Sequence, residues 1–372
     1  MARIPVARPD LTGNEEAYVV DAIRSSWISS AGPYVTRFEE SFAELCGTQH
    51  AIGVCNGTVA LHLAMLALGV EPGDEVIVPS LTYIATANAV RYVGAEPVFV
   101  DVDPQTWTID PRLIEEAITP RTRGIIPVHL YGHPADMDAI NRIAGIHGLW
   151  VVEDAAEAPF ATYKDRPTGG LARLATFSFY GNKVLTSGEG GAVTVNDEAL
   201  ALRLRTLRGQ GVDPTRRYYF PVTGYNFRIT NLACALLCAQ LERAQAMLAA
   251  RRAIYERYAA QLSAVPGIAL QPVAPWATVS PWLFCLTVDD HGRDGPNRDR
   301  VMSALESADI ETRPFFIPLH RLPPFKAESM RRGESLPETD RLGASGLNLP
   351  TYVGMTDADV DRVCDAALRA LK

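Results

Sequence analysis

Between residues 51 and 154 the sequence alternates short apolar runs with longer segments of helical periodicity. The apolar runs predict strands at 51–54, 75–79, 97–102, 124–128 and 149–153. The segments between them predict helices at 84–93, 111–118 and 137–147, after a first buried helix that follows residue 58. Strands that are apolar at nearly every position need cover on both faces, as in a mainly parallel sheet flanked by helices. The alternation therefore predicts an α/β fold, in which ligands bind beyond the carboxyl ends of the strands.

A second, smaller unit is expected beyond this alternation. Residues 232–262 predict one long helix, and the remainder predicts a strand at 282–288, a helix at 298–308, a strand at 311–316 and further helices. We place a domain boundary inside the long helix, near Gln245. The 372 residues then form a large domain at 1–245 and a smaller C-terminal α/β domain at 246–372.

The composition and charge argue against several classes of protein. Hydrophobic residues make up 47% of the chain and charged residues 21%, as in ordinary globular proteins. The formal net charge of −8 comes without a basic stripe, which argues against nucleic-acid binding. Residues 1–13 lack the apolar core of a signal peptide, and no apolar run is long enough to span a bilayer. The six cysteines are scattered, and Cys234 and Cys238 are expected to be buried on a helix rather than bound to a metal, so a reducing, cytoplasmic compartment is expected.

A hydrogen-bonding turn precedes the first buried helix. The strand at 51–54 is followed by Cys55, Asn56, Gly57 and Thr58, and the helix begins there. The free N–H groups and the positive end of the dipole in a first helical turn can hold an anion. Helix capping alone would explain Asn56 and Thr58. A phosphate site at Gly57 and Thr58 therefore depends on what else the fold brings to this turn.

The stretch at 175–191 carries one lysine, Lys183, between a strand-like run and a glycine-rich turn. Most lysines are solvated surface charges. A lysine that leaves a buried strand beside hydroxyl groups is, in contrast, a candidate nucleophilic amine, because desolvation lowers its pKa. Thr58, Tyr83 and Asp154 also follow predicted strands, so the four side chains are expected at one edge of the sheet.

Asp154 follows the strand at 149–153, and by itself capping of the next helix would explain it. Pyridoxal phosphate chemistry, however, needs a lysine for a Schiff base and a carboxylate that keeps the pyridine nitrogen protonated. It also needs a helix N-terminus with hydroxyl groups for the phosphate, and a flat side chain over the ring. The sequence offers a candidate for each need, in that order Lys183, Asp154, Gly57 with Thr58 and Ser178, and Tyr83.

Four motifs resemble those of a known family. They are EDAAEA at 153–158, TFSFYGNK at 176–183, GEGG at 188–191 and GYNFR at 224–228. The pattern is similar to that of the DegT/DnrJ/EryC1/StrS sugar aminotransferases, which are fold-type I pyridoxal-phosphate enzymes. The likeness covers essentially the whole chain, including WISSAGPYVTRFE near the start and LNLPTY near the end. It implies a large cofactor-binding domain with a mainly parallel sheet, a small C-terminal domain, and a homodimer with shared active sites.

The resemblance also implies roles for individual residues. Lys183 would bind the cofactor covalently and move a proton between the cofactor and the sugar carbon. Asp154 would pair with the pyridine nitrogen, Glu157 would lie near the ring 3-oxygen, and Tyr83 would stack on the ring.

The phosphate ligands implied by the family come from two subunits. Asn226 would reach across from one subunit, and the other would supply Gly57, Thr58 and Ser178. The expected substrate contacts are Ser30, Arg228, Arg313 and His320. An isolated histidine is, however, more often structural than a ligand.

Family likeness further suggests the substrates. Glu157, the FYGNK form of the lysine motif and the stretch at 208–228 are closest to members that aminate GDP-4-keto-6-deoxymannose. The amino donor would be L-glutamate. A TDP- or UDP-linked ketosugar, a ketocyclitol or another keto-sugar of antibiotic or polysaccharide assembly stays open, because a fold and its cofactor site do not set the substrate pocket.

Two other functions would use parts of the same pattern. Pyridoxamine-dependent sugar dehydratases share the scaffold but carry histidine in place of the lysine, so Lys183 argues against that activity. A non-catalytic regulatory or nucleotide-binding protein would need neither Lys183 nor Asp154 and would show no cofactor absorbance. The two residues together favour an enzyme.

Overall fold

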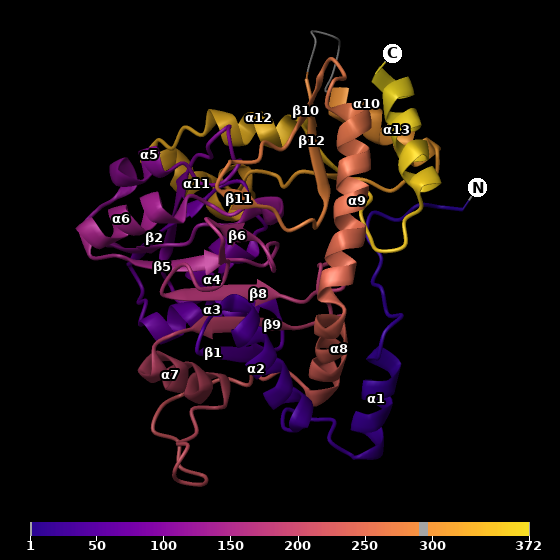
Figure 1. Cartoon of the computed structure of the whole chain (residues 1–372). Helices are drawn as coiled ribbons and strands as arrows, with labels where there is room; N and C mark the ends of the chain where they lie inside the picture. Colours follow the sequence, from indigo (N-terminus) through magenta and orange to yellow (C-terminus); the bar gives the residue numbers. More distant parts are fainter. Residues whose placement is uncertain (1, 290–296, 372) are drawn as a thin grey trace.

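The computed structural model describes residues 2–289 and 297–371, and its largest element is a seven-stranded sheet (Figure 1). The strands lie in the order β1-β9-β8-β5-β4-β2-β3. Their bounds are β1 His50–Val54, β2 Glu75–Pro79, β3 Glu96–Val100, β4 Thr122–Ile125, β5 Trp150–Asp154, β8 Leu174–Ser178 and β9 Gly191–Val195. Of these seven described strands, β9 alone runs against the others, because it pairs antiparallel with both β1 and β8. The prediction of a mainly parallel sheet is confirmed.

Both faces of this sheet are buried, and the strand sequences explain why. Adjacent residues of a strand point to opposite faces. Val152 of β5 and Leu174 of β8 belong to one hydrophobic cluster, whereas their neighbours Val151 and Ala175 belong to two other clusters. Such strands have no polar face to turn toward water, so the sheet requires helices on both sides.

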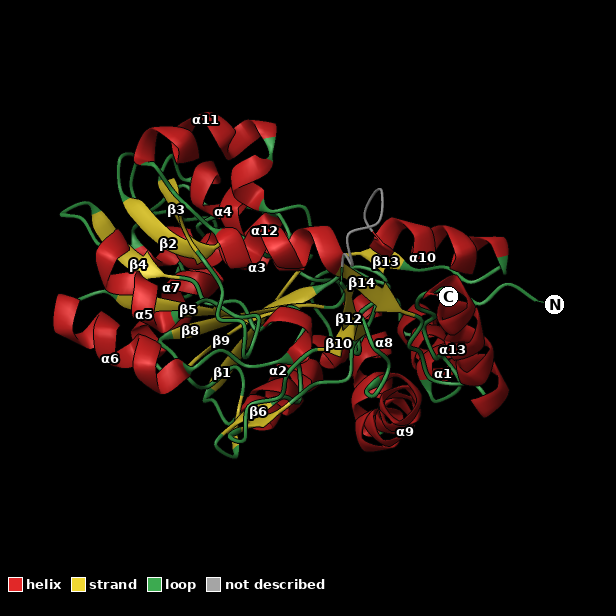
Figure 2. Ribbon diagram, turned by 90° about the horizontal axis from the view of Figure 1, so that it is seen from above, coloured by secondary structure: helices red, strands yellow, loops and turns green. Residues whose placement is uncertain are grey.

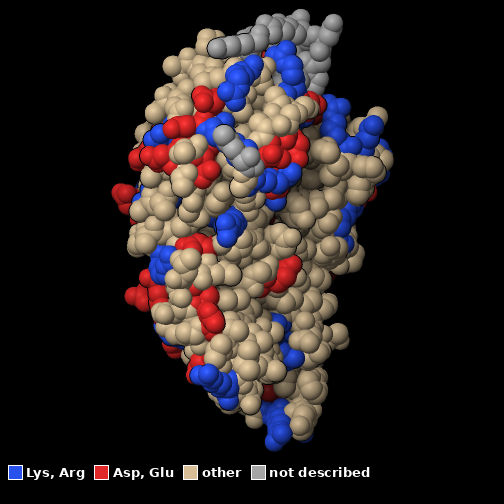
Figure 3. Space-filling view, turned by 90° about the vertical axis from the view of Figure 1, so that its right-hand side faces the viewer, with Lys and Arg blue, Asp and Glu red and all other residues tan. Residues whose placement is uncertain are grey.

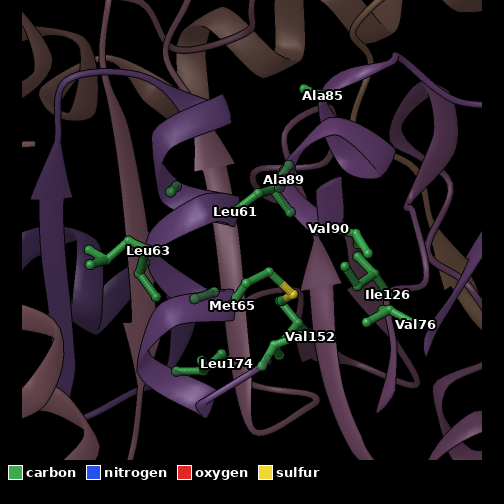
Figure 4. Packing of buried hydrophobic residues seen from close by; sticks show 14 of the residues in the cluster. Leu61, Leu63, Met65, Val76, Ala85, Ala89, Val90, Ile126, Val152 and Leu174 are labelled. Carbon is green, nitrogen blue, oxygen red and sulfur yellow. The ribbon is translucent and has the colours of Figure 1, made fainter. Parts of the chain in front are cut away.

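The helices on one face are α3 (Gly57–Leu68), α4 (Ala85–Tyr92) and α7 (Glu198–Arg208). Figure 4 shows Leu61 of α3 beside Ala89 of α4, and Met65 of α3 beside Val152 of the sheet. The cluster on the other face includes α2 (Pro33–Cys46) and α8 (Asn231–Glu242), with Cys234 and Cys238 buried in it. A separate cluster joins α6 (Met137–His147) to β2, β3, β4 and β5.

A buried glutamate ties the loops around β5 together. Glu153 is fully buried, and Oε2 accepts a 3.0 Å hydrogen bond from Nε2 of His129. Nδ1 of His129 accepts the N–H of Ala135, so the ring proton lies on Nε2. The same carboxylate accepts the backbone N–H groups of Gly169, Leu171 and Ala172. Because a buried charge is costly unless hydrogen bonds satisfy it, these bonds fix the loop before β8 and the segment after β4 against β5.

A four-stranded antiparallel sheet lies to one side of the large sheet (Figures 1 and 2). Its order is β10-β12-β14-β13, with bounds β10 Ile268–Leu270, β12 Phe284–Val288, β14 Gly346–Leu349 and β13 Arg313–Pro314. Its hydrophobic cluster includes α9 (Ala244–Leu262), α10 (Asn297–Ser307) and α13 (Asp357–Leu371). β13 is shorter than the strand predicted at 311–316, and Pro314 has no N–H to extend the ladder. The division into domains at residue 245 stays a prediction.

The prediction of one long helix at 232–262 is wrong. The structure has two helices, α8 and α9, which are bent by 66° at Arg243. Asp10, near the N-terminus, accepts hydrogen bonds from residues just before the bend and at it. Its backbone carbonyl accepts one from the side chain of Gln240, and its carboxylate accepts one from the side chain of Arg243. The two helices also contribute side chains to different hydrophobic clusters. These long-range contacts favour the bend and leave no trace in the local helical pattern.

The remaining α-helices and strands are short or peripheral. They are α1 Glu15–Arg24, α5 Pro111–Ile114, α11 Pro323–Arg332 and α12 Pro337–Ser345, together with a small sheet of β11 Ala277–Thr278, β6 Thr162–Tyr163 and β7 Arg166–Pro167. A capping box precedes α13, because Thr356 and Asp359 exchange side-chain-to-backbone hydrogen bonds.

The surface carries charges of both signs. On the face shown in Figure 3, Lys and Arg side chains are interspersed with Asp and Glu. Within the two described stretches, no single helix is long and apolar enough to cross a membrane, and only the bent pair α8 and α9 meets the length and composition test jointly.

Candidate active site at the carboxyl ends of the strands

Lys183 lies in the loop that follows β8, and its amine is enclosed by other side chains. The side chain is 12% exposed, and Nζ lies 3.6 Å from Oε1 of Glu157. Nζ also lies 3.8 Å from the ring centre of Trp282. Loss of hydration lowers the pKa of the Lys183 amine, and the carboxylates of Glu157 and Asp154 oppose part of that change. The site therefore favours the neutral amine more than water does, as a nucleophilic lysine requires.

Asp154 ends β5, and its side chain is nearly buried. Oδ2 accepts a 2.7 Å hydrogen bond from the Thr86 hydroxyl, and Oδ1 accepts a 3.2 Å bond from the N–H of Ala156. Burial raises the pKa of Asp154, and both hydrogen bonds oppose this rise. A cationic group placed next to this carboxylate would restore part of the stabilisation that it loses on leaving water.

Glu157 lies in the turn after β5 and faces the lysine. It is buried, and Oε2 accepts a 2.8 Å hydrogen bond from the backbone N–H of Tyr131. Burial raises the pKa of Glu157, and the charge of Lys183 is the largest opposing effect. Tyr131 has φ of 52°, a left-handed conformation that is uncommon for an aromatic residue, and its ring stacks on Phe316. Packing of that ring therefore helps to hold the donor that Glu157 uses.

The predicted phosphate residues meet where β8 ends and α3 begins. A Cβ atom on Gly57 would lie 2.7 Å from Cβ of Ser178, so only glycine allows this approach. The side chain of Asn56 caps the helix through the N–H of Val59 rather than that of Gly57 or Thr58. The structure thus brings Gly57, Thr58 and Ser178 together at a helix N-terminus, which suits an anion.

Tyr83 lies on the rim of the site, in the loop between β2 and α4. Its side chain is 58% exposed, and its ring centre lies 5.9 Å from that of Phe316. The carbonyl of Tyr83 accepts the N–H of Thr86, whose hydroxyl binds Asp154. The start of α4 therefore connects the loop of Tyr83 with the carboxylate at the end of β5.

The segment at 226–228 lies beside the predicted phosphate turn of its own chain. The carbonyl of Phe227 accepts the N–H of Cys55, and Arg228 forms an isolated antiparallel bridge with Val54. Arg228 is partly buried, whereas Asn226 is exposed. The role of Asn226 in the site of another subunit stays a prediction, because the structure contains one chain.

Ser30 and Arg313 come from distant parts of the chain. Ser30 lies in the loop before α2, which the buried Asn231 holds by accepting the N–H of Tyr34 and donating to the carbonyl of Trp27. Arg313 lies on β13 with a side chain that is 45% exposed, and its positive charge contributes to the lowered pKa of Lys183. Their predicted contacts with substrate stay predictions.

His320 is buried and has protein partners on both ring nitrogens. Nδ1 lies 2.8 Å from the hydroxyl of Ser80, and Nε2 lies 3.1 Å from Oδ1 of Asp340. Burial lowers the pKa of His320. These contacts join the end of β2 to α12 and give the ring a structural use, while its contact with substrate stays a prediction.

Three further residues of the cluster carried no signal of their own in the sequence. Thr86 lies within a predicted helix, Tyr131 lies in a loop, and Trp282 begins a predicted strand. Their contacts with Asp154, Glu157 and Lys183 span between 26 and 99 positions of sequence. Only the fold makes them neighbours of the predicted site.

The comparison with known proteins decides the family. Residues 9–368 match the DegT/DnrJ/EryC1/StrS aminotransferase family. The chain belongs to this family. The GDP-perosamine synthase of Caulobacter vibrioides is 48% identical to this chain over 367 residues, which cover 98% of each chain. The predictions of the family and of an aminotransferase are confirmed.

Two further proteins are similar to this chain over nearly its whole length. The Bacillus subtilis protein EpsN, named as a putative pyridoxal phosphate-dependent aminotransferase, is 35% identical and covers 98% of this chain and 95% of its own. The crystal structure of Streptomyces venezuelae DesV in complex with a ketimine intermediate is 38% identical, with a TM-score of 0.92 over 100% of both chains. The predicted type I aminotransferase fold is confirmed.

Thr86 offers a test of how Asp154 is stabilised. Replacing Thr86 with Val keeps the shape but leaves Oδ2 of the buried carboxylate without its donor. We expect the apoprotein to lose about 2 kcal/mol of unfolding free energy at neutral pH. Burial places the folded-state pKa of Asp154 above its unfolded value, so the loss should shrink as the pH falls and the carboxyl group becomes protonated. Urea unfolding at several pH values measures this.

Thr86→Ser is the matched control, because it keeps the hydroxyl. It should retain most of the stability that Thr86→Val loses. A loss in Thr86→Val that is the same at every pH would contradict the assigned hydrogen bond.

Proposed function

We propose that this aminotransferase uses pyridoxal 5′-phosphate to transfer an amino group from L-glutamate to the keto carbon of GDP-4-keto-6-deoxymannose, giving GDP-perosamine. The observation that carries the proposal is the enclosed amine of Lys183, which faces Glu157 in a site that also holds Asp154. The identity of 48% to a GDP-perosamine synthase over nearly the full chain supports this sugar.

Besides Lys183, the residues fit the proposed cofactor at two places. The glycine at position 57 leaves room between Ser178 and the start of α3, where backbone N–H groups and the helix dipole suit a phosphate. The buried carboxylate of Asp154 suits a protonated ring nitrogen. When bound, pyridoxal phosphate supplies an aldehyde that bonds to amines and a protonated ring that draws electrons away from the reacting carbon.

In this proposal each side chain of the site contacts a particular part of the cofactor or substrate. Asp154 keeps the ring nitrogen protonated, and Glu157 lies toward the 3-oxygen of the ring. Tyr83 covers the exposed face of the ring with its own flat side chain. Ser30, Arg228, Arg313 and His320 are proposed for the amino donor and the sugar nucleotide, and the two arginines match the carboxylate and diphosphate chemistry of those substrates.

Lys183 is proposed to move the proton that the transfer requires. Once its amine is free, it can take a proton from the α-carbon of the amino donor and later deliver one to the sugar carbon. The lowered pKa increases the fraction of the amine that is neutral at a given pH. Glu157, 3.6 Å away, stabilises the ammonium form after the proton has been taken up. The enclosed position also limits loss of that proton to water.

Replacing Lys183 with Ala tests the proposed cofactor bond. The variant should lack the visible absorbance band of covalently bound pyridoxal phosphate, and amino transfer should fall by ~10³-fold or more because base and bond are both lost. Lys164→Ala is the matched control, since Lys164 is an exposed lysine that pairs with Asp138. A Lys183→Ala protein that keeps the wild-type band would contradict the proposed covalent bond between Lys183 and the cofactor.

A substrate panel tests the proposed sugar. Purified protein with L-glutamate is assayed against GDP-, TDP- and UDP-linked 4-keto-6-deoxysugars and ketocyclitols, with mass spectrometry of the products. We expect turnover with GDP-4-keto-6-deoxymannose to exceed that with the other acceptors by at least ~10-fold, since specificity differences of a few contacts reach this size. Turnover with only a TDP- or UDP-linked sugar would overturn the sugar and leave the transferase proposal standing.

The proposed dimer with shared sites is tested with mixed subunits. Asn226→Asp places a negative charge where a phosphate ligand is proposed, so it should weaken cofactor binding. In a dimer of Lys183→Ala and Asn226→Asp subunits, one site regains both residues only if Asn226 serves the partner. Equal mixing should then restore activity to about a quarter of wild type, because symmetric dimers assemble at random.

The outcome of the mixing separates two arrangements. The segment at 226–228 already borders the turn at Cys55 of its own chain. If Asn226 served its own site, the mixed dimers would stay as inactive as each variant alone.

A further inference from the structure

Trp282 presents the face of its ring to the amine of Lys183. Nζ lies 3.8 Å from the ring centre, well within the distance at which an ammonium group is attracted by an aromatic face. The indole is the most favourable of the aromatic rings for such a contact. It carries no titratable group, so it can hold the ammonium form without exchanging a proton with it. Nothing in the proposed transfer accounts for this contact.

The indole is fixed at its edge by the chain that bears the lysine. Nε1 donates a 2.8 Å hydrogen bond to the carbonyl of Asn182, the residue before Lys183. The ring therefore holds the backbone next to the lysine and contacts the end of its side chain. The backbone of Trp282 is held as well, because its carbonyl accepts a 3.0 Å bond from the buried guanidinium of Arg251 on α9. With 4% of the residue exposed, the ring has little freedom to move.

The same indole is connected to the carboxylate that also faces the amine. Trp282 stacks on Tyr131, with ring centres 6.2 Å apart and planes 27° apart. The N–H of Tyr131 donates to Oε2 of Glu157, whose other oxygen faces Nζ of Lys183. An aromatic face and a carboxylate thus both lie close to the amine, and Tyr131 links the two.

We propose that Trp282 is a positioning residue that holds the Lys183 amine beside Glu157 whenever that amine has no covalent bond to the cofactor. The inference rests on the proposed role of Lys183. During the transfer the amine must leave the cofactor, act on a proton, and return to the same carbon. A long, flexible side chain that is held in one place returns faster than one that samples many rotamers.

The charges around the amine set the sign of the expected effect. Glu157 and Asp154 favour the ammonium form, whereas Arg313 and burial disfavour it. The ring face of Trp282 also favours the ammonium form, because its quadrupole attracts a cation. Removing the face, with the other charges unchanged, should therefore lower the apparent pKa of the Lys183 amine.

The experiment follows covalent attachment of pyridoxal phosphate to full-length apoprotein. The rate of growth of the visible band is measured against pH, since only the neutral amine attacks the aldehyde. Trp282→Leu and Trp282→Phe both lose the N–H, but only Phe keeps an aromatic face. We expect Trp282→Leu to lower the midpoint of the profile by ~1 pH unit and to slow the plateau rate several-fold. Trp282→Phe should show a smaller shift in the same direction.

Two controls separate positioning from general damage to the site. Trp276→Leu removes another tryptophan of the same region, one whose ring contacts His133 and Tyr163, and should leave the midpoint unchanged. Pyridoxine 5′-phosphate has the ring and phosphate but no aldehyde. Its dissociation constant should change less than about twofold in the Trp282 variants, because its binding does not involve the amine.

The outcomes are distinct. An unchanged midpoint in folded Trp282→Leu, or equal shifts in the Leu and Phe variants, would overturn the role of the ring face. Loss of pyridoxine 5′-phosphate binding in Trp282→Phe would show a structural role instead and would also overturn it. If wild-type apoprotein gives no visible band with pyridoxal phosphate, the proposed role of Lys183 itself fails, independently of Trp282.

Discussion

The site depends on two adjacent carboxylates at the end of β5 that are buried on opposite faces of the sheet. Glu153 points into the scaffold, where His129 and three backbone N–H groups satisfy it. Asp154 points to the other face, where Thr86 and Ala156 bind it. The strand alternation makes this division unavoidable, because neighbours on a strand point in opposite directions. The first carboxylate fixes the loops around β5, and the second is then held where a ligand can use it.

Burial of charged groups is the common cause of the electrostatics around Lys183. It lowers the pKa of the amine and raises the pKa values of Asp154 and Glu157, so each group is displaced toward its neutral form. Their mutual attraction opposes all three displacements. The protonation of each group is therefore set by burial on one side and by the charges of its neighbours on the other. The aromatic face of Trp282 belongs to the same balance.

The sequence was informative where a local pattern has one physical explanation. Continuous apolar strands require cover on both faces, and this predicted the mainly parallel sheet. The placement of Asp154 and Lys183 after such strands predicted the edge at which we propose the chemistry. Local pattern failed at 232–262, because the bend at Arg243 comes from contacts with Asp10 and from two separate hydrophobic clusters. The local pattern gave no indication that Thr86 and Trp282 lie at the site, since a threonine in a helix and a tryptophan at a strand are ordinary core residues.

By itself, the sequence determined the fold class and the family, because these follow from periodicity and from motifs that lie within short stretches, and the same motifs supplied the residues that we propose for the chemistry. The tertiary structure decided how those residues are held. It brought Thr86 to Asp154 and Tyr131 to Glu157, and it placed the ring of Trp282 over the amine of Lys183. It also placed both nitrogens of His320 against Ser80 and Asp340. Contacts between residues far apart in the chain are set by packing of the whole core, which no local pattern encodes.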